Sequence, residues 1–309
     1  MTEKRIGVVF PGQGSQYVGM GKDLYQNYRV FVDVFDAGSE ICGFDIAQVC
    51  FEGPLEKLTE TEICQVCVFA AGYGAWKVLQ HELPFVPSFA AGHSLGEYTA
   101  FTASEAFSFQ DAMALVSKRA KFMKDATMQN PGGMIAILGK SLADIETVVN
   151  LFDGVHISNI NAPGQIVMGG TKQGIEALSK WCDENRVKYI VLNVSGAFHT
   201  PLMEPAVQPL AKEIDDTSIS MCKFPVYANF SGEPIINPEQ IKHALKKQIV
   251  SPVQWIKTIE AVKNSVDCIV ELGPKKVLSG LIKKIAPELG ISNVEDIDSL
   301  RKTIEVLKL

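Results

Sequence analysis

The sequence predicts an α/β protein in which a small domain interrupts a larger one. Near both ends of the 309-residue chain, short apolar runs alternate with amphipathic stretches. This alternation is typical of a parallel sheet covered by helices. Between them, over residues 127–196, the order becomes strand, helix, strand, strand, helix, strand. That order is the split βαβ unit of ferredoxin-like domains.

The first part of the larger domain contains short, almost wholly apolar runs. Such runs are typical of parallel strands that are buried on both faces. We expect strands at residues 6–10 and 87–91, and helices at residues 61–80, 95–103 and 111–126.

Glycine-containing turns bound the inserted unit. Pro131-Gly-Gly133 precedes its first strand, and Ser195-Gly196 follows its last. The expected strands are residues 134–138, 155–159, 165–169 and 188–194, and the expected helices are 142–152 and 172–185. We therefore expect a ferredoxin-like small domain at 127–196. The large domain would combine residues 1–126 with 197–309.

After the insertion the α/β alternation resumes. Helices are expected at 202–214, 253–263 and 277–285, and strands at 225–229 and 268–272. The last strand ends in Gly273-Pro274, a turn sequence that stops it sharply.

The composition excludes several classes of protein. A hydrophobic content of 47% with 21% charged residues describes a globular protein. No run of 18 apolar residues is present, so we expect no membrane span. The net charge of −6 argues against nucleic-acid binding. The first residues lack the apolar region of a signal peptide, so we expect a cytoplasmic protein.

The seven cysteines are scattered, and their odd number favours reduced thiols. Cys64 and Cys67 have C-x-x-C spacing, but no second pair or nearby histidine completes a zinc site. Because they lie in an apolar helical stretch, we expect them to be core thiols. No metal site is predicted.

Residues 92–96 read Gly-His-Ser-Leu-Gly, between an expected strand and an expected helix. This context is that of the nucleophile elbow, in which a sharp turn exposes a serine above the sheet. We therefore expect an α/β-hydrolase-like large domain with Ser94 as nucleophile. The alternative is an ordinary turn in which Ser94 caps the helix.

A serine needs a base to take its proton. Among five histidines, His81 and His243 lie in polar helical stretches and His156 opens a strand. His93 is adjacent to Ser94, so its side chain should point elsewhere. His199 lies in a glycine-containing loop between a strand and a helix, a common place for a base. A packed loop histidine is the alternative.

These residues belong to a longer series of motifs. In order, they are FPGQGSQ at 10–16, GHSLGE at 92–97, Arg119, NAPGQ at 161–165, GAFH at 196–199 and PVQW at 252–255. Together they resemble the malonyl-CoA:acyl-carrier-protein transacylase family, from Val8 to about Leu281.

The resemblance implies a Ser94–His199 dyad without an acidic third member. The backbone carbonyl near Gln248 would orient the second ring nitrogen of His199, although Gln248 alone reads only as a polar residue on a helix. The oxyanion hole would use the backbone N–H groups of Leu95 and Gln13. Dinucleotide binding is a rival reading of the loop at 11–15, but its spacing is not G-x-G-x-x-G.

Arg119 is the residue that indicates the chemistry of the substrate. Its helix places Leu115, Arg119 and Phe122 on one apolar side, so its guanidinium should be buried. A buried arginine needs a partner, and a carboxylate matches its planar fork. That carboxylate is either a protein side chain or, as the resemblance implies, the free carboxylate of malonyl.

Two further residues are expected at the substrate. The resemblance implies that Phe198 crowds branches on the acyl α-carbon, with loop packing as its alternative. Asn161 could line the cleft, or it could serve only the turn in which it lies. Because Ser94 belongs to the large domain and His199 follows the small one, we expect the site in the cleft between them.

The implied reaction carries malonyl from malonyl-CoA to the phosphopantetheine thiol of an acyl carrier protein, through a Ser94 ester and with ping-pong kinetics. No metal or redox cofactor is needed, and we expect a monomer. An acyl hydrolase of the same fold and a non-catalytic carrier-binding scaffold are the alternatives. Carriers are usually acidic, so docking would need a local basic patch. Candidate lysines are Lys118, Lys121, Lys124, Lys275, Lys276, Lys283 and Lys284.

Overall fold

Two β-sheets organise the protein, whose computed structural model describes residues 4–308. The larger, sheet A, has the strand order β10-β9-β1-β2-β7-β8. Its strands are β1 (Ile6–Phe10), β2 (Phe89–Gly92), β7 (Val226–Tyr227), β8 (Pro234–Ile235), β9 (Cys268–Leu272) and β10 (Gly290–Val294). All neighbours pair in parallel except β8, which is antiparallel to β7. Every residue of β1, β2 and β9 is buried, as expected of central strands.

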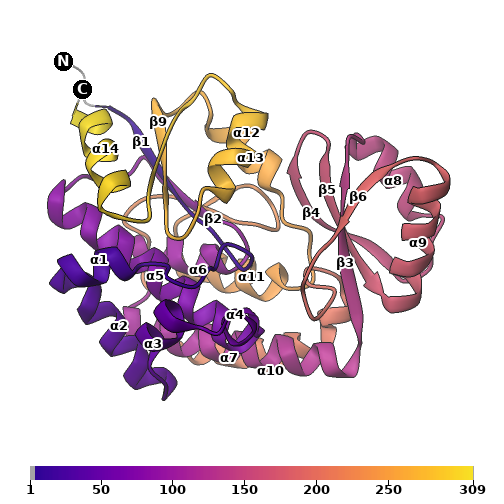
Figure 1. Ribbon diagram of the computed structural model, residues 1–309, viewed down its shortest axis with the longest axis horizontal. Helices are drawn as coiled ribbons and strands as arrows, with labels where there is room; N and C mark the ends of the chain where they lie inside the picture. The colour runs from indigo at the N-terminus through magenta and orange to yellow at the C-terminus, as the bar shows by residue number, and fades with distance from the viewer. Residues whose placement is uncertain (1–3, 309) are drawn as a thin grey trace.

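Helices cover both faces of sheet A (Figure 1). They are α1 (Lys22–Asn27), α2 (Arg29–Cys42), α3 (Ile46–Glu52), α4 (Leu55–Thr59), α5 (Thr61–Glu82), α6 (Leu95–Ala103), α7 (Phe109–Gln129), α10 (Glu204–Asp216), α11 (Pro238–Gln248), α12 (Trp255–Val262), α13 (Val277–Ile285) and α14 (Ile297–Lys308). Fifteen of the 22 residues of α5 are buried, because it packs against α2, α6 and α7. Cys64 and Cys67 are buried, free thiols on α5, as predicted. None of the helices in the described range is long and apolar enough to cross a membrane.

Sheet B has the order β4-β5-β3-β6, and all of its pairs are antiparallel. Its strands are β3 (Gly132–Leu138), β4 (Val155–Ala162), β5 (Gln165–Thr171) and β6 (Lys188–Val191), with helices α8 (Leu142–Val149) and α9 (Lys172–Glu184). Both helices lie on the side of sheet B that faces away from sheet A (Figure 1). This arrangement confirms the ferredoxin-like βαββαβ unit and the overall α/β fold.

The large lobe contacts sheet B along β4, against which α12 and α13 pack. The backbone N–H of Ile160 donates to the carbonyl of Val253 at 2.9 Å, and the N–H of Val253 donates to Ser158 at 2.9 Å. The segment before α12 therefore pairs with the edge strand of sheet B. This pairing fixes one wall of the cleft between the sheets.

Several element boundaries differ from the sequence expectation. α7 continues to Gln129, so a domain boundary at 127 would cut its last turn, and the division at 126/127 and 196/197 stays a prediction. The helix expected at 202–214 begins as the 3₁₀ turn Pro201–Met203 and continues as α10. β3 begins at Gly132, whose backbone lies so close to Gly170 that a side chain there would press on the neighbouring strand.

Candidate active site

The turn between β2 and α6 holds Ser94 in a backbone conformation that L-residues rarely adopt. Its φ is 53° and its ψ is −106°. A Cβ on Gly92 would overlap the backbone of Gly96, and a Cβ on Gly96 would overlap the carbonyl of Phe10. Both glycines are therefore required by close backbone approach. This is the geometry of a nucleophile elbow, and its strain is of the kind that gathers at functional sites.

Side chains from two distant segments hold this backbone in place. Asn229 accepts from the Ser94 N–H at 2.6 Å and donates to the Gly92 carbonyl at 2.6 Å. The Gln248 amide donates to the Ser94 carbonyl at 2.9 Å. The Ser94 hydroxyl makes no capping bond to α6, so the alternative of a simple helix cap is not what the structure shows.

His199 is the histidine that reaches the serine. Its Nε2 lies 2.7 Å from Ser94 Oγ, and its Nδ1 lies 2.8 Å from the backbone oxygen of Gln248. Because a carbonyl can only accept, Nδ1 carries the proton and Nε2 is free to accept from the serine hydroxyl. Burial and the nearby Arg119 charge lower the pKa of His199 to about 3. The ring is therefore neutral and ready to accept a proton.

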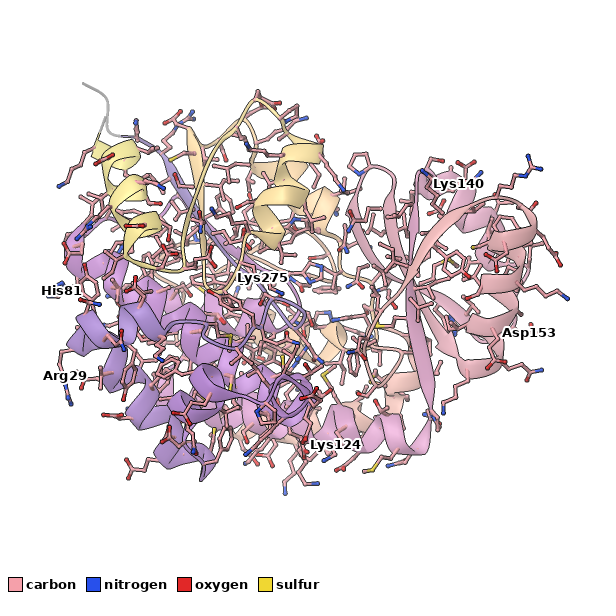
Figure 2. All side chains as sticks on the ribbon, viewed as in Figure 1. Arg29, His81, Lys124, Lys140, Asp153 and Lys275 are labelled. Atoms are coloured by element: carbon pink, nitrogen blue, oxygen red, sulfur yellow. The ribbon has the colours of Figure 1, made fainter. Side chains whose placement is uncertain are left out.

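The other histidines lie elsewhere. His93 Nε2 is 2.8 Å from Asn161 Oδ1, so its ring turns away from the serine, as expected. His81 projects from the outer edge of the large lobe (Figure 2), where its side chain is 60% exposed. His243 makes an edge-to-face contact with Phe230, away from the cleft. Position in the fold thus separates His199 from the rest.

Arg119 is 1% exposed and points at the same serine. Its Nη2 donates to Ser94 Oγ at 3.1 Å and to Gln248 Oε1 at 2.9 Å, and its Nη1 donates to Gln65 Oε1. Its Nε has no hydrogen-bond partner. No carboxylate of residues 4–308 lies within 4.0 Å of the guanidinium. In residues 4–308, the alternative of a protein carboxylate in direct contact with Arg119 is therefore not what the structure shows.

Two backbone N–H groups beside Ser94 have no acceptor among the described residues, those of Gln13 and Leu95. The loop at 11–15 lies directly against the elbow, because a Cβ on Gly12 would fall 3.6 Å from the Leu95 nitrogen and would overlap the His93 carbonyl. Unpaired N–H groups that converge beside a nucleophile are the donors that an oxyanion hole requires.

A cavity of about 180 Å³ opens above these groups, in the cleft between the sheets. Its wall combines residues of both lobes, including Gln13, Ser94, Leu95, Met123, Asn161, Phe198, His199 and Leu281. Phe198 is 6% exposed and borders the cavity beside His199. Gln248, expected among the substrate-binding residues, is fully buried behind Arg119 and His199. Its contacts position these two residues rather than line the cavity.

The chain is similar to known acyltransferases along almost its whole length. The family described as acyl transferase domain matches residues 8–302. A malonyl CoA-acyl carrier protein transacylase from Bacillus subtilis (strain 168) is 37% identical over 310 residues, which cover 98% of each chain. The chain belongs to the malonyl CoA-acyl carrier protein transacylase family.

Solved structures of other transacylases have the same fold as this one. That from Coxiella burnetii matches with a TM-score of 0.95 at 31% identity, over 99% of both chains. A malonyl-transacylase in complex with its type II polyketide synthase acyl-carrier protein matches with a TM-score of 0.94 at 34% identity. That match covers 98% of this transacylase and 99% of the other chain.

Sequence reasoning left several side chains of the transacylase site unassigned. Gln65 and Asn229 lie far along the chain from the residues they hold, and no local pattern marks them. Glu97 stood inside a quoted motif without a role, yet it is fully buried beneath Ser94. Within residues 4–308, no cluster of three histidine, cysteine or acidic side chains could hold a metal ion.

Proposed function

We propose that this transacylase transfers malonyl from malonyl-CoA to the phosphopantetheine thiol of an acyl carrier protein. The observation that carries the proposal is Arg119, a buried cation with no protein carboxylate, 3.1 Å from Ser94 Oγ. A guanidinium so placed matches the free carboxylate of a malonyl group bound at the serine. The names of the relatives agree with this substrate.

In the first half-reaction, His199 Nε2 takes the hydroxyl proton as Ser94 Oγ attacks the thioester carbonyl. Charge then develops on the carbonyl oxygen, and the N–H groups of Gln13 and Leu95 stabilise it. As the tetrahedral intermediate collapses, the C–S bond breaks and His199 returns the proton to the departing CoA thiolate. A malonyl ester on Ser94 remains.

The second half-reaction runs the same steps with the carrier thiol. His199 takes the thiol proton, the sulfur attacks the ester carbonyl, and the proton passes to Ser94 Oγ as it leaves. The malonyl group passes from the CoA thioester to the Ser94 ester and then to the carrier thioester, and no atom changes its oxidation state. For that reason we propose that no resident cofactor takes part, since malonyl-CoA is a substrate.

Substrate binding also prepares the base. The Arg119 charge is one cause, after burial, of the low pKa of His199. A malonyl carboxylate bound at Arg119 would compensate that charge and make protonation of the ring easier. A substrate without a carboxylate, such as acetyl-CoA, lacks this effect. The malonyl group thus favours its own transfer.

The lysine clusters differ in their capacity to dock an acidic carrier. Lys118, Lys121 and Lys124 on α7 are each paired with a carboxylate, those of Glu213, Asp125 and Glu62. Lys275 and Lys276 precede Val277, which borders the cavity, and no ion pair of the described residues engages them. Figure 2 shows Lys275 near the middle of the molecule and Lys124 at its lower edge. We propose that the carrier docks at Lys275 and Lys276.

We further propose that the enzyme is a cytoplasmic monomer that serves fatty-acid synthesis, the more common setting of a discrete transacylase. The same residues would serve a polyketide carrier.

Intact-protein mass after brief exposure to malonyl-CoA or acetyl-CoA tests the proposal. We expect a malonyl adduct on the wild type, none on Ser94→Ala, and loss of malonyl preference in Arg119→Ala. Free malonate without an adduct would instead identify an acyl hydrolase. Neither adduct nor malonate would leave a non-catalytic scaffold.

A further inference from the structure

Glu97 is a buried acid that the proposed mechanism leaves without a role. It lies on the first turn of α6, three residues after Ser94, and is fully buried. Its Oε1 accepts from the backbone N–H of Asn229 at 3.1 Å, and its Oε2 accepts from Nε2 of Gln248. Both oxygens therefore face donors from segments that hold the active site.

The hydrogen bonds around Gln248 allow only one orientation of its amide. Arg119 can only donate, so Gln248 must present Oε1 to it, at 2.9 Å. The Ser94 carbonyl and the Glu97 carboxylate only accept, and they use the two hydrogens on Nε2. With Glu97 as an ionised acceptor, every polar atom of this side chain is satisfied.

Gln248 in turn contacts Arg119, Ser94 and His199. Its side chain holds Arg119 and the Ser94 carbonyl, and its backbone oxygen accepts from Nδ1 of His199 at 2.8 Å. Glu97, which fixes the orientation of Gln248, therefore acts on Arg119 without touching the substrate.

The buried charge of Arg119 also points to Glu97. A buried guanidinium needs a nearby negative charge, but a carboxylate in direct contact would occupy the nitrogens that the substrate must use. Glu97 lies one amide away from Arg119, on the far side of Gln248. It can compensate the cation without occupying any N–H of the guanidinium.

We propose that Glu97 is a positioning residue: its buried carboxylate orients the Gln248 amide and supplies the counter-charge of Arg119 from one residue away, leaving the guanidinium open to the acyl carboxylate. The inference rests on the proposed function, because it gives Arg119 the role of clamp.

The test compares steady-state transfer from malonyl-CoA and acetyl-CoA at pH 8. Burial raises the pKa of Glu97 to about 7, so the carboxylate is the main form at that pH. In Glu97→Gln, the NH₂ group of the new amide must face either the Asn229 N–H or the Gln248 NH₂, and two donors cannot form a hydrogen bond. We expect the malonyl-to-acetyl ratio of kcat/KM to fall about tenfold or more, chiefly through KM for malonyl-CoA.

Glu271→Gln is the matched control. Glu271 is also fully buried and accepts only from Leu278 and Ser279 at the start of α13. It loses the same charge, so we expect lower stability but a ratio within about twofold of wild type. An equal fall of the ratio in both variants would overturn the proposal.

Gln248→Met keeps the backbone carbonyl that holds His199 and removes the amide. If Glu97 acts through that amide, Gln248→Met must lower the ratio by a similar factor. The double variant must then be no worse than Gln248→Met alone. Additive effects, or a preserved ratio in Gln248→Met, would overturn the proposal even if Glu97→Gln failed to fold.

Arg119→Ala separates the two levels of inference. If Arg119→Ala loses malonyl preference while Glu97→Gln keeps it, only the role of Glu97 fails. If Arg119→Ala keeps the preference for malonyl, both the proposed clamp role of Arg119 and the role of Glu97 that rests on it fail.

Discussion

The strained backbone of Ser94, the proposed nucleophile, predicts that this residue lowers the stability of the protein. With φ at 53° and ψ at −106°, the residue occupies a region that glycine enters freely. Such strain costs ~1–3 kcal/mol, and glycine loses ~0.4–1 kcal/mol more entropy on folding than alanine. We therefore expect Ser94→Gly to be more stable than Ser94→Ala by ~0.5–2 kcal/mol.

Ser94→Ala is the right reference because both variants lose the same bonds. Each removes the hydroxyl that contacts His199 and Arg119, and only the glycine releases the backbone. Urea unfolding and thermal melts measure the difference. With ~2–4 °C per kcal/mol, the melting temperature of Ser94→Gly should be ~1–8 °C higher.

Neither variant should form an acyl-enzyme, so the gain in stability comes with loss of the reaction. A Ser94→Gly protein no more stable than Ser94→Ala would refute the reasoning. It would mean that the bonds from Asn229 and Gln248 make this conformation favourable for any side chain.

Three further outcomes are expected. Gly96→Ala should lower the free energy of unfolding by ~3 kcal/mol or more, because its Cβ would overlap the Phe10 carbonyl; a normal denaturation midpoint would contradict this. Because the pKa of His199 is about 3, lowering the pH from 8 to 5 should leave the ring neutral. Single-turnover acylation at saturating acetyl-CoA, which brings no carboxylate to Arg119, should then fall less than ~3-fold. A fall of ~30-fold, as for a base of ordinary pKa, would exclude this assignment. Lys276→Glu should raise KM for an acidic carrier by ~3–10-fold at low salt, with Lys121→Glu as the comparison; equal effects would rule out docking at Lys276.

Local pattern was sufficient for the elements that bury apolar runs. The bounds of β1, β9, α6 and α13 match the sequence expectation. β1 and β9 are short apolar runs buried on both faces, α6 follows directly from the glycine turn at Ser94, and the apolar residues of α13 recur with the helical period. The strand expected at 225–229 is only the two residues Val226–Tyr227 of β7. By contrast, β8, which has two residues, and the largely half-exposed β10 were not predicted. These strands exist because a neighbouring strand offers hydrogen bonds, which no local pattern reveals.

The helices α1–α4 were also not predicted. Three of them, α1, α3 and α4, have five to seven residues, which is too short for periodicity to be informative. The 14-residue α2 is long enough and was missed.

For the site, the sequence by itself determined the chemistry that had to be local. The glycines around Ser94 and the loop at 11–15 encode a sharp turn and a close approach, which depend on neighbours in the chain. Only the tertiary structure decided the rest. The partners of Arg119 come from α5 and α11, and Glu97 meets Asn229 and Gln248 more than a hundred residues away. Hydrogen bonds in a buried site depend on distances of a few tenths of an ångström. The packing of the two sheets sets those distances, and no spacing along the chain does.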